Sequence, residues 1–553
     1  MKKLILLIVL TLIIQTSVIS QSCLPNGIIF STQEEIDNFQ ANYPNCSQIE
    51  GDVYIDGGNI SNLNGLNILT SFGGDLNIGT YYGNPVLTNL VGLDNITNIE
   101  GDLIIGSLFC GISNPSLSSL TGLESLNYVG GFISIESNDL LHDLVGLSGL
   151  TSIENYLQII KNHQLQNLND LLNLTHIEGG LSIHYDSTLN SLSGLINVVN
   201  INGSLSISSC ISLASLSGLD NLSHIESLSI VDNQQLSGLN ELINIDSLNG
   251  NLEIQINNSL IDLSGLNNVY YVGGEVEIFR NDNLINLSGL NNIAFIGGDL
   301  RITDNNNLLS ISSLENVSIV GGYLGIKSND ALPSLTGLNS IISVGQTFNV
   351  SHNNNLTSLL GLNNLTSVGY NCWIRGNSTL TNLSGLENLS SINGDIKIED
   401  NPKLISITGI ENIDTESIVS LQITNNPLLS KCEVQSICDY IISPNAIVNI
   451  SNNDTGCNNQ TEVQEACEAL LVTEHDLETR ITIYPNPTKN MLFLKGSYGK
   501  IINKVTIYNQ VGQNVLNQTN IANRIDISTL EQGLYVIEVT SNELKLRKKL
   551  IIK

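Results

Sequence analysis

The feature of this sequence that most constrains its fold is a repeat of 24 residues. A phrase of the form L-x-I-x-x-N-x-x-L recurs along the chain, and a second phrase, L-x-G-L-x-N-L, recurs with the same period, so that about fifteen units fit between residues 51 and 430. Self-similarity at a fixed period of this length is typical of solenoids, in which each unit buries its apolar face against its neighbours. The Asn position of the first phrase advances by 24 residues, except for one step of 23 and one of 25, through Asn138, Asn162, Asp186, Cys210, Asn233, Asn257, Asn281, Asn305, Asn329, Asn353, Asn377, Asn401 and Asn426.

The order of residues within one unit predicts how the chain coils. In Leu300-Arg301-Ile302 the first and third side chains point one way and the second points the other way, because strand side chains alternate. One short strand per unit, stacked at ~4.8 Å, makes a parallel sheet with Leu and Ile inside. The Asn side chains can satisfy buried backbone groups at the turn, and Gly pairs such as Gly297-Gly298 are expected to supply positive φ at a corner. We therefore predict a mainly β fold, a right-handed parallel β-helix or leucine-rich-repeat-like solenoid of about fifteen 24-residue coils.

The first 20 residues have the pattern of a secretory signal peptide. Lys2 and Lys3 precede an apolar run from Leu4 to Ile14, and Val18 and Ser20 suit a cleavage before Gln21. A membrane anchor is the alternative, but a spanning helix needs ~20 apolar residues and this run is much shorter. We therefore expect the chain to be exported, with no transmembrane segment after cleavage.

Charge is distributed unevenly along the chain. The whole sequence has 21 basic and 52 acidic residues, a net charge of −31. From Arg480 to Lys553 there are 11 basic and 4 acidic residues, so residues 4–479 carry 8 basic and 48 acidic ones, a net of −40. This acidity argues against nucleic acid as a partner, because phosphate binding needs clustered Lys and Arg. The reversal near residue 480 also marks a domain boundary.

The last 73 residues have short alternating apolar runs that predict a small antiparallel β-sandwich. Four motifs occur there in order: Tyr484-Pro485-Asn486-Pro487, then a run ending at Gly512, then Gly533-Leu534-Tyr535, then a terminal segment with Lys548 and Lys549. In combination they resemble a type IX secretion (Por-type) C-terminal sorting domain. The resemblance implies that this domain engages the type IX export machinery, crosses the outer membrane with its cargo and is then removed. An ordinary adhesive β-sandwich is the alternative.

The repeat itself resembles the receptor L-domain and related leucine-rich families. The resemblance covers roughly residues 25–470 and includes Tyr43-Pro44-Asn45-Cys46 and Ile49-Glu50-Gly51-Asp52-Val53. Such domains bind protein ligands in eukaryotic receptors, which implies recognition as the default role here and transfers no specific binding residue. This chain departs from those receptors because no Cys-rich module interrupts its coils.

Nine cysteines in an exported chain suggest disulfides and one unpaired thiol. Cys23 and Cys46 flank an expected capping helix opened by a Ser31–Glu34 capping box, and we predict that they pair. At the other end, Ser430–Glu433 and Thr461–Gln464 suggest two more capped helices, with two bridges that connect Cys432 and Cys438 to Cys457 and Cys467 in an order left open. Cys210 and Cys372 are interpreted as small buried apolar residues rather than nucleophiles, and no role is assigned to Cys110.

The solvent face of the predicted sheet changes character along the chain. The middle strand residues of the first half are mostly Ser, whereas the second half carries charged and aromatic residues, including the one Trp of the sequence. Aromatic residues beside charges are typical of recognition surfaces, although ordinary solvated surface is the alternative for each residue taken singly. The predicted binding residues are Glu277, Phe279, Arg301, Tyr323, Lys327, Trp373, Arg375 and Lys397.

Catalytic signals are weak. Glu253 and Glu277 are one coil apart, ~5 Å along the stack, which suits a retaining glycosidase, but any two Glu residues in adjacent coils would achieve this. His and Cys spacings match no metal site, and no phosphate-binding loop or Ser-His-Asp pattern is visible, so we predict no metal and no cofactor.

The leading hypothesis is a non-catalytic recognition or adhesion scaffold, secreted or attached to the outer cell surface, that binds an extracellular protein or glycan. The alternative is a β-helix carbohydrate-active enzyme, a polysaccharide lyase or glycosidase, using acidic residues on the sheet face. The predicted segments are a signal peptide at 1–20, an N-terminal cap at 21–50, the solenoid at 51–430, a C-terminal cap at 431–470, a linker at 471–480 and the sorting domain at 481–553.

Overall fold

The computed structural model describes residues 21–107, 113–470, 481–496, 502–519, 524–541 and 544–553. The predicted signal peptide, the predicted linker and Cys110 lie outside the described residues. The chain divides into two units, Met1–Gly322 and Tyr323–Lys553, which are described separately below. No helix of the described residues is both long enough and apolar enough to cross a membrane.

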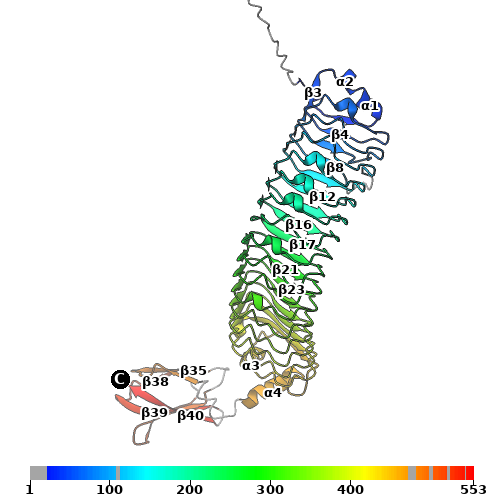
Figure 1. Ribbon diagram of the computed structural model, residues 1–553. Helices are drawn as coiled ribbons and strands as arrows, with labels where there is room; N and C mark the ends of the chain where they lie inside the picture. Colours follow the sequence, from blue (N-terminus) through cyan, green and yellow to red (C-terminus); the bar gives the residue numbers. More distant parts are fainter. Residues whose placement is uncertain (1–20, 108–112, 471–480, 497–501, 520–523, 542–543) are drawn as a thin grey trace, which may run out of the picture. The chain divides into compact units, whose positions relative to one another are not determined.

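The first unit is a stack of parallel strands (Figure 1). Neighbouring strands keep a fixed register, so that Leu252 lies opposite Val276 and Ile254 lies opposite Ile278. Their Leu, Ile and Val side chains point inward and are fully buried, while the residues between them face outward. The strands of this sheet in the first unit are β2 (Ile28–Phe30), β4 (Val53–Ile55), β6 (Leu76–Ile78), β8 (Leu103–Gly106), β10 (Ile133–Glu136), β12 (Leu157–Ile160), β14 (Leu181–His184), β16 (Ser204–Ser208), β17 (Ser227–Val231), β19 (Leu252–Gln255), β21 (Val276–Phe279) and β23 (Leu300–Thr303).

The other side of most coils contains a short strand, and six coils of this unit also contain a single 3₁₀ turn. The short strands pair in parallel with the equivalent strands of the next coil, as Tyr271 does with Phe295. They are β1 (Gln21–Cys23), β3 (Cys46–Ile49), β5 (Ser71–Phe72), β7 (Asn98–Ile99), β9 (Tyr128–Val129), β11 (Ser152–Ile153), β13 (His176–Ile177), β15 (Asn200–Ile201), β18 (Ser247–Leu248), β20 (Tyr271–Val272), β22 (Phe295–Ile296) and β24 (Ile319–Val320). The 3₁₀ turns of this unit are η1 (Asn64–Leu66), η2 (Val145–Leu147), η3 (Asn169–Leu171), η4 (Ser193–Leu195), η5 (Asn240–Leu242) and η6 (Ser312–Leu314).

A ladder of buried Asn side chains fastens each coil to the next. Asn257 donates from Nδ2 to the Ile230 carbonyl of the preceding coil at 2.8 Å, and its Oδ1 accepts the backbone N–H of Asn233 at 3.0 Å. Its own backbone N–H donates to Oδ1 of Asn281, 3.0 Å away. Each ladder Asn thus satisfies one donor and one acceptor that burial would otherwise leave unpaired.

The expectation about corner glycines is wrong. Positive φ occurs instead at the residue before the ladder position, such as Arg280 (φ 52), and at the Gly of the second phrase, such as Gly289 (φ 114). Gly297 is needed for a different reason, because a Cβ on it would lie 2.2 Å from the Gly273 carbonyl oxygen. The corner glycines therefore permit close stacking of the coils rather than a left-handed turn.

The N-terminal end of the first unit is closed by two short helices, α1 (Gln33–Asp37) and α2 (Phe39–Asn42). The capping box is formed by Thr32 and Glu35, one residue later than predicted. Ile36 and Phe39 are buried under the coils. Cys23 and Cys46 form a disulfide with a Cα–Cα distance of 5.7 Å.

The second unit continues the same architecture. Its long strands are β25 (Leu324–Lys327), β27 (Phe348–Ser351), β29 (Cys372–Arg375), β31 (Gly394–Glu399), β32 (Ile418–Thr424) and β33 (Val448–Ser451). Its short strands are β26 (Ser343–Val344), β28 (Ser367–Val368) and β30 (Ser391–Ile392), with one 3₁₀ turn, η7 (Thr415–Ser417). Together the two units confirm the predicted mainly β, parallel solenoid.

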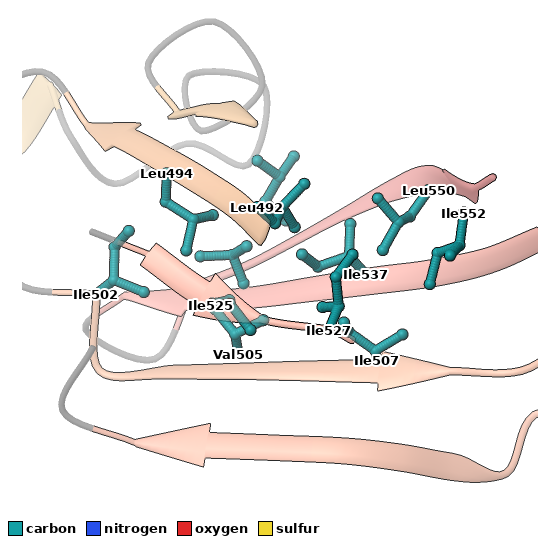
Figure 2. Close-up of a cluster of buried hydrophobic side chains, with 12 residues drawn as sticks. Leu492, Leu494, Ile502, Val505, Ile507, Ile525, Ile527, Ile537, Leu550 and Ile552 are labelled. Atoms are coloured by element: carbon teal, nitrogen blue, oxygen red, sulfur yellow. The ribbon is translucent and has the colours of Figure 1, made fainter. Parts of the chain in front are cut away.

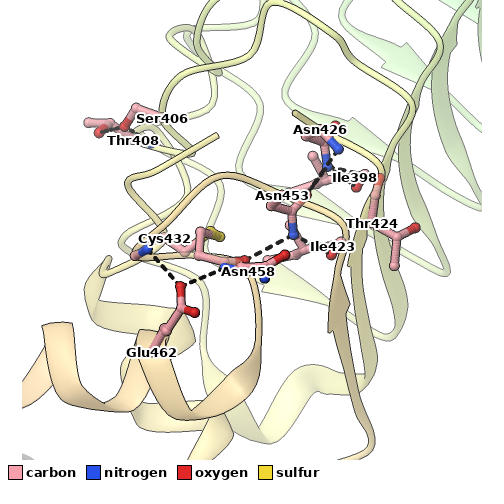
Figure 3. Close-up of a disulfide and its surroundings, with 12 residues drawn as sticks. Ile398, Ser406, Thr408, Ile423, Thr424, Asn426, Cys432, Asn453, Asn458 and Glu462 are labelled. Carbon is pink, nitrogen blue, oxygen red and sulfur yellow. Dashed lines mark hydrogen bonds between the residues drawn. A yellow bond between two sulfur atoms is a disulfide. The ribbon is translucent and has the colours of Figure 1, made fainter. Parts of the chain in front are cut away.

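Two helices close this end, α3 (Gln435–Ile441) and α4 (Gln460–Leu470). Neither predicted capping box forms: Val434 at the start of α3 makes no side-chain cap, and α4 is capped by Asn459, whose Oδ1 accepts the N–H of Glu462 at 3.0 Å. Figure 3 shows that Glu462 also accepts the N–H of Asn458 beside the Cys432 disulfide. The bridges are Cys432–Cys457 and Cys438–Cys467, with Cα–Cα distances of 5.6 and 5.8 Å.

The C-terminal residues form two antiparallel sheets around a separate apolar core (Figure 2). One sheet has the order β34 (Ile481–Tyr484), β35 (Met491–Gly496) and β38 (Arg524–Asp526), and the other β37 (Asn514–Thr519), β36 (Lys504–Tyr508), β39 (Gly533–Ser541) and β40 (Leu544–Ile552). Leu492, Ile507, Ile525 and Ile537 lie in the core that joins them.

Candidate functional site

The predicted binding residues lie on the outward side of the long-strand sheets, and they fall in both units. In the first unit, Glu277 is paired in register with Glu253 on one side and Arg301 on the other. Burial raises the pKa of Glu277, and the neighbouring carboxylates Glu275 and Glu253 raise it further while Arg301 lowers it. Arg301 is held by Asp299, 2.5 Å from its Nη2. This part of the face is acidic.

Phe279 lies at the end of β21 and is half-buried. The guanidinium of Arg280 lies over its ring, 5.0 Å from the centroid. Arg280 also pairs with Asp304 at 3.7 Å. The ring of Phe279 is therefore partly covered by its neighbour in the sequence.

In the second unit, the remaining predicted residues lie on β25, β29 and β31 of a four-strand segment, with Tyr323 directly before β25. Gly325, Asn349, Trp373 and Lys397 lie side by side in register on β25, β27, β29 and β31. Two residues further along each strand, a second outward row contains Lys327, Ser351, Arg375 and Glu399. We call the set Tyr323, Lys327, Trp373, Arg375 and Lys397 the basic-aromatic face.

The aromatic rings of this face are held in fixed positions. The ring of Tyr323 occupies the space beside Gly325, where a Cβ would be 2.2 Å from its Cε1. Its hydroxyl accepts a hydrogen bond from Nδ2 of Asn349 at 2.8 Å. The Trp373 ring has the Lys397 ammonium 5.5 Å from its centroid, a cation–π contact. Among the described residues, Trp373 Nε1 and Asn349 Oδ1 are buried without a hydrogen-bond partner.

The cations of the basic-aromatic face differ in their pairing. Arg375 forms an ion pair with the nearly buried Glu399, with Nε 2.7 Å from Oε2. Asp395, two residues before Lys397, accepts the hydroxyl of Ser420 at 2.6 Å. Within the part of the chain that the structure describes, Lys327 and Lys397 have no carboxylate at ion-pair distance. Lys327 is exposed to solvent.

The ladder has one chemical defect, at two consecutive coils of the first unit. Asp186 takes the Asn position, and its Oδ1 accepts the N–H of Asn162 at 2.7 Å. Its Oδ2 is buried and has no partner among the described atoms, and burial raises the pKa of Asp186 to about 8. Cys210 follows it in the next coil, where burial raises the pKa of the thiol to about 12. Cys372 is also buried as a free thiol, and burial raises its pKa to about 12.

Several residues of these sites were not selected from the sequence. Asn349 and Glu399 share the strand phase of Trp373 and Arg375, so the 24-residue spacing was the signal that could have identified them. The ladder also extends to Asn84, Asn114 and Asn453, which bond to Asn114, Asn138 and Asn426 respectively. Insertions lengthen the spacing from Asn84 to Asn114 and from Asn426 to Asn453 beyond 24 residues, so the period does not identify Asn84 and Asn453. A metal site is not formed by any group of three His, Cys, Asp or Glu side chains in the described ranges.

The motifs of the C-terminal domain come together in the fold. Asn486 donates to the Lys549 carbonyl at 2.7 Å and accepts the N–H of Ile551 at 2.9 Å, which fixes the Tyr484–Pro487 segment to β40. Gly512 lies in the turn between β36 and β37 with φ 82. Gly533 begins β39, where Tyr535 donates its hydroxyl to the Glu531 carbonyl at 2.8 Å. Lys548 and Lys549 lie opposite Ile537 and Val536 on the paired strand.

Comparison with known proteins identifies two segments. Residues 482–553 match the model of the secretion system C-terminal sorting domain, and residues 244–336 match the model of the receptor L domain. No curated protein matches the chain. Among solved structures, a crystal structure of a TLR13–ssRNA13 complex is similar at 15% identity and a TM-score of 0.28, over 74% of this chain and 67% of that chain. The chain therefore combines a solenoid segment similar to the receptor L domain with a C-terminal segment similar to the sorting domain. The match to the sorting domain indicates secretion or export to the outer cell surface.

Proposed function

We propose that this protein is a non-catalytic recognition or adhesion scaffold, which the type IX machinery exports and which binds an extracellular protein or glycan through the outward face of its long-strand sheet. The observation that carries the proposal is the basic-aromatic face. Tyr323 accepts a hydrogen bond from Asn349, Trp373 contacts the Lys397 ammonium, and Trp373 Nε1 and Asn349 Oδ1 lie on adjacent strands without partners among the described residues. An unpaired buried polar atom costs about 1–3 kcal/mol, which a ligand that opens the site can recover.

The solenoid supports this role physically. Within each unit, every coil adds outward positions at a spacing of ~4.8 Å, so a regular surface is available for an extended ligand. The outward face of the first unit, taken by itself, contributes Glu277, Phe279 and Arg301 as further candidates. We also propose the predicted boundaries, with the solenoid and its two caps at residues 21–470 and the sorting domain at residues 481–553.

The proposal is tested by binding of the purified full chain to arrays of glycans and extracellular proteins. Trp373→Ala should weaken binding by about tenfold or more, because a central aromatic residue dominates the energy of such a contact. Tyr370→Ala is the matched control, since Tyr370 is 59% exposed and lies outside the strand rows. Equal binding by wild type and Trp373→Ala would reject the face as the recognition surface.

A carbohydrate-active enzyme is the second candidate, and one observation favours it. Glu253 and Glu277 are in register on adjacent strands, and the raised pKa of Glu277 suits a general acid. Against this role, Glu277 already accepts a hydrogen bond from Gln255 at 2.9 Å and Glu253 accepts one from Ser229 at 3.1 Å. Turnover of a polysaccharide that is abolished by Glu277→Gln would establish the enzyme.

A further inference from the structure

The cations of the solenoid are few, and three of them share one face of the second unit. Residues 4–479 contain 8 Lys and Arg residues against 48 Asp and Glu residues. Three of these eight, Lys327, Arg375 and Lys397, occupy outward positions on β25, β29 and β31 of the second unit. The lysines of this part of the chain, Lys327 and Lys397 included, have no carboxylate at ion-pair distance among the described residues, and what sets these two apart is that they share one face with Tyr323 and Trp373. Neither ammonium is neutralised by a carboxylate, although that of Lys397 also contacts the Trp373 ring.

The surroundings of these cations suit sugar rings. The ring of Tyr323 lies against Gly325, and Asn349 donates a hydrogen bond to its hydroxyl. Trp373 lies between Asn349 and Lys397 in the first outward row and is half-buried. Aromatic faces next to amide and hydroxyl groups can contact the apolar side of a sugar and bond its hydroxyl groups at once.

A protein partner fits this face less well. Interfaces between proteins need a desolvated apolar centre, usually with several large side chains. The exposed large apolar residues of the second unit's coils, Ile342, Leu360, Tyr370, Ile405, Val419 and Leu428, all lie outside the two outward rows. The face carries charged and amide side chains beside its two rings and extends across strands, which matches a linear polymer of hydrophilic units.

We propose that the basic-aromatic face binds an anionic polysaccharide, with carboxylate or sulfate groups at Lys327 and Lys397 and sugar rings against Tyr323 and Trp373. This inference rests on the proposed function and names its ligand class. The net negative charge of the chain opposes a polyanion at long range, but at 0.15 M ionic strength the Debye length is about 8 Å. Carboxylates beyond this distance are screened, and Glu399 in the second outward row is already paired with Arg375, so charge-assisted hydrogen bonds from the ammonium groups can supply local affinity.

The test measures binding of the full chain to polygalacturonate and to dextran sulfate, with unmodified dextran and poly-glutamate as comparison polymers. The double variant Lys327→Gln/Lys397→Gln should bind the anionic polysaccharides about tenfold or more weakly. The matched control is Lys403→Gln/Lys431→Gln, which makes the same change in net charge at two exposed lysines outside the face. An unchanged thermal unfolding midpoint for both variants shows that the fold is retained.

Loss of binding in the first variant alone supports the proposal, and preference between the two polymers identifies the acidic group. Equal binding of poly-glutamate would show a general polyanion site and overturn the glycan assignment. Failure to bind either anionic polysaccharide, or equal weakening by both lysine pairs, would also overturn it. Trp373-dependent binding of a neutral glycan or a protein, with no binding of the polyanions, would leave the proposed function in place and reject this inference alone.

Discussion

At the scale of single residues, the ladder shows how one side-chain type stabilises a long stack. Asn suits this position because its amide carries both a donor and an acceptor, and each is used between consecutive coils. The ladder could be predicted from the 24-residue period, whereas its extension to Asn84 and Asn453 could not, because insertions change the spacing there. The first capping box could not be placed to the residue from the sequence. Ser31 and Thr32 both have Glu three residues later, and the backbone conformation makes Thr32 the N-cap residue.

Replacement of a ladder Asn should destabilise the solenoid locally. Asn281→Ala removes the partner of the Ile254 carbonyl and of the Asn257 N–H, both buried, so we expect a loss of about 2–5 kcal/mol. Asn283→Ala is the control, because the Asn283 amide bonds the Asn258 carbonyl at the exposed surface. Chemical denaturation measures both, and comparable midpoints for the two variants would contradict the role of the ladder.

Asp186 makes the stability of the first unit depend on pH. Its pKa is about 8 in the folded chain against 3.8 in an exposed carboxyl, so near neutral pH it is protonated and its Oδ2–H can donate where a ladder Asn uses Nδ2. Between pH 3.8 and about 8 the folded chain holds a proton that the unfolded chain releases, so stability falls as the pH rises. This fall in the free energy of unfolding amounts to about 5 kcal/mol at pH 8 and vanishes below pH 4, and Asp186→Asn should remove it.

Thermal unfolding from pH 4 to pH 9 provides the measurement for Asp186. The exposed Asp139→Asn is the control, and its effect should not change with pH in the same way. If the difference between wild type and Asp186→Asn is independent of pH, the carboxyl is not a neutral member of the ladder.

At the scale of elements, the repeat phrase predicts the strand and its direction because alternation and period are properties of the sequence alone. The positive φ at residues such as Arg280 could not be predicted, since the coil imposes it on many residue types. The caps are a second kind of element. At the C-terminal end, α3 and α4 cover the last coil, which has no further coil to pack against, and two disulfides cross-link this cap. The pairing order of these cysteines required the positions of the helices.

Removal of the last bridge should loosen the C-terminal cap and leave the first unit intact. The Cys438–Cys467 loop spans 29 residues, and by loop entropy its bridge contributes about 3–4 kcal/mol. In Cys438→Ser/Cys467→Ser, amide hydrogens of α3 and β33 should exchange faster, while those of β10 to β14 serve as the internal control. Unchanged exchange in α3 would show that packing alone holds the cap.

At the scale of the whole molecule, two parts of opposite charge are joined, and their tasks differ. The basic C-terminal domain matches a secretion sorting domain, and the acidic solenoid provides the surface that is exported. The solenoid architecture could be predicted because its phrases repeat along the chain. Export could be predicted because the sorting motifs are clustered at the C-terminus. The ligand could not, because the basic-aromatic face combines residues from separate strands and its chemistry depends on their pairing.

Deletion of residues 481–553 should keep the protein in the periplasm, because the sorting signal is then absent. Cell fractionation of the producing organism measures this, with Lys403→Gln/Lys431→Gln as a full-length control that should be exported normally. Normal export of the truncated chain would contradict the role assigned to the sorting domain.

The most direct test of the account measures binding and turnover in the same sample. The purified full chain is mixed with polygalacturonate, and the bound fraction and the chain length of the polymer are both followed over time. We expect saturable binding that depends on Trp373 and no change in chain length. Shortening of the polymer that Glu277→Gln abolishes would contradict a non-catalytic recognition scaffold and would establish the enzyme instead.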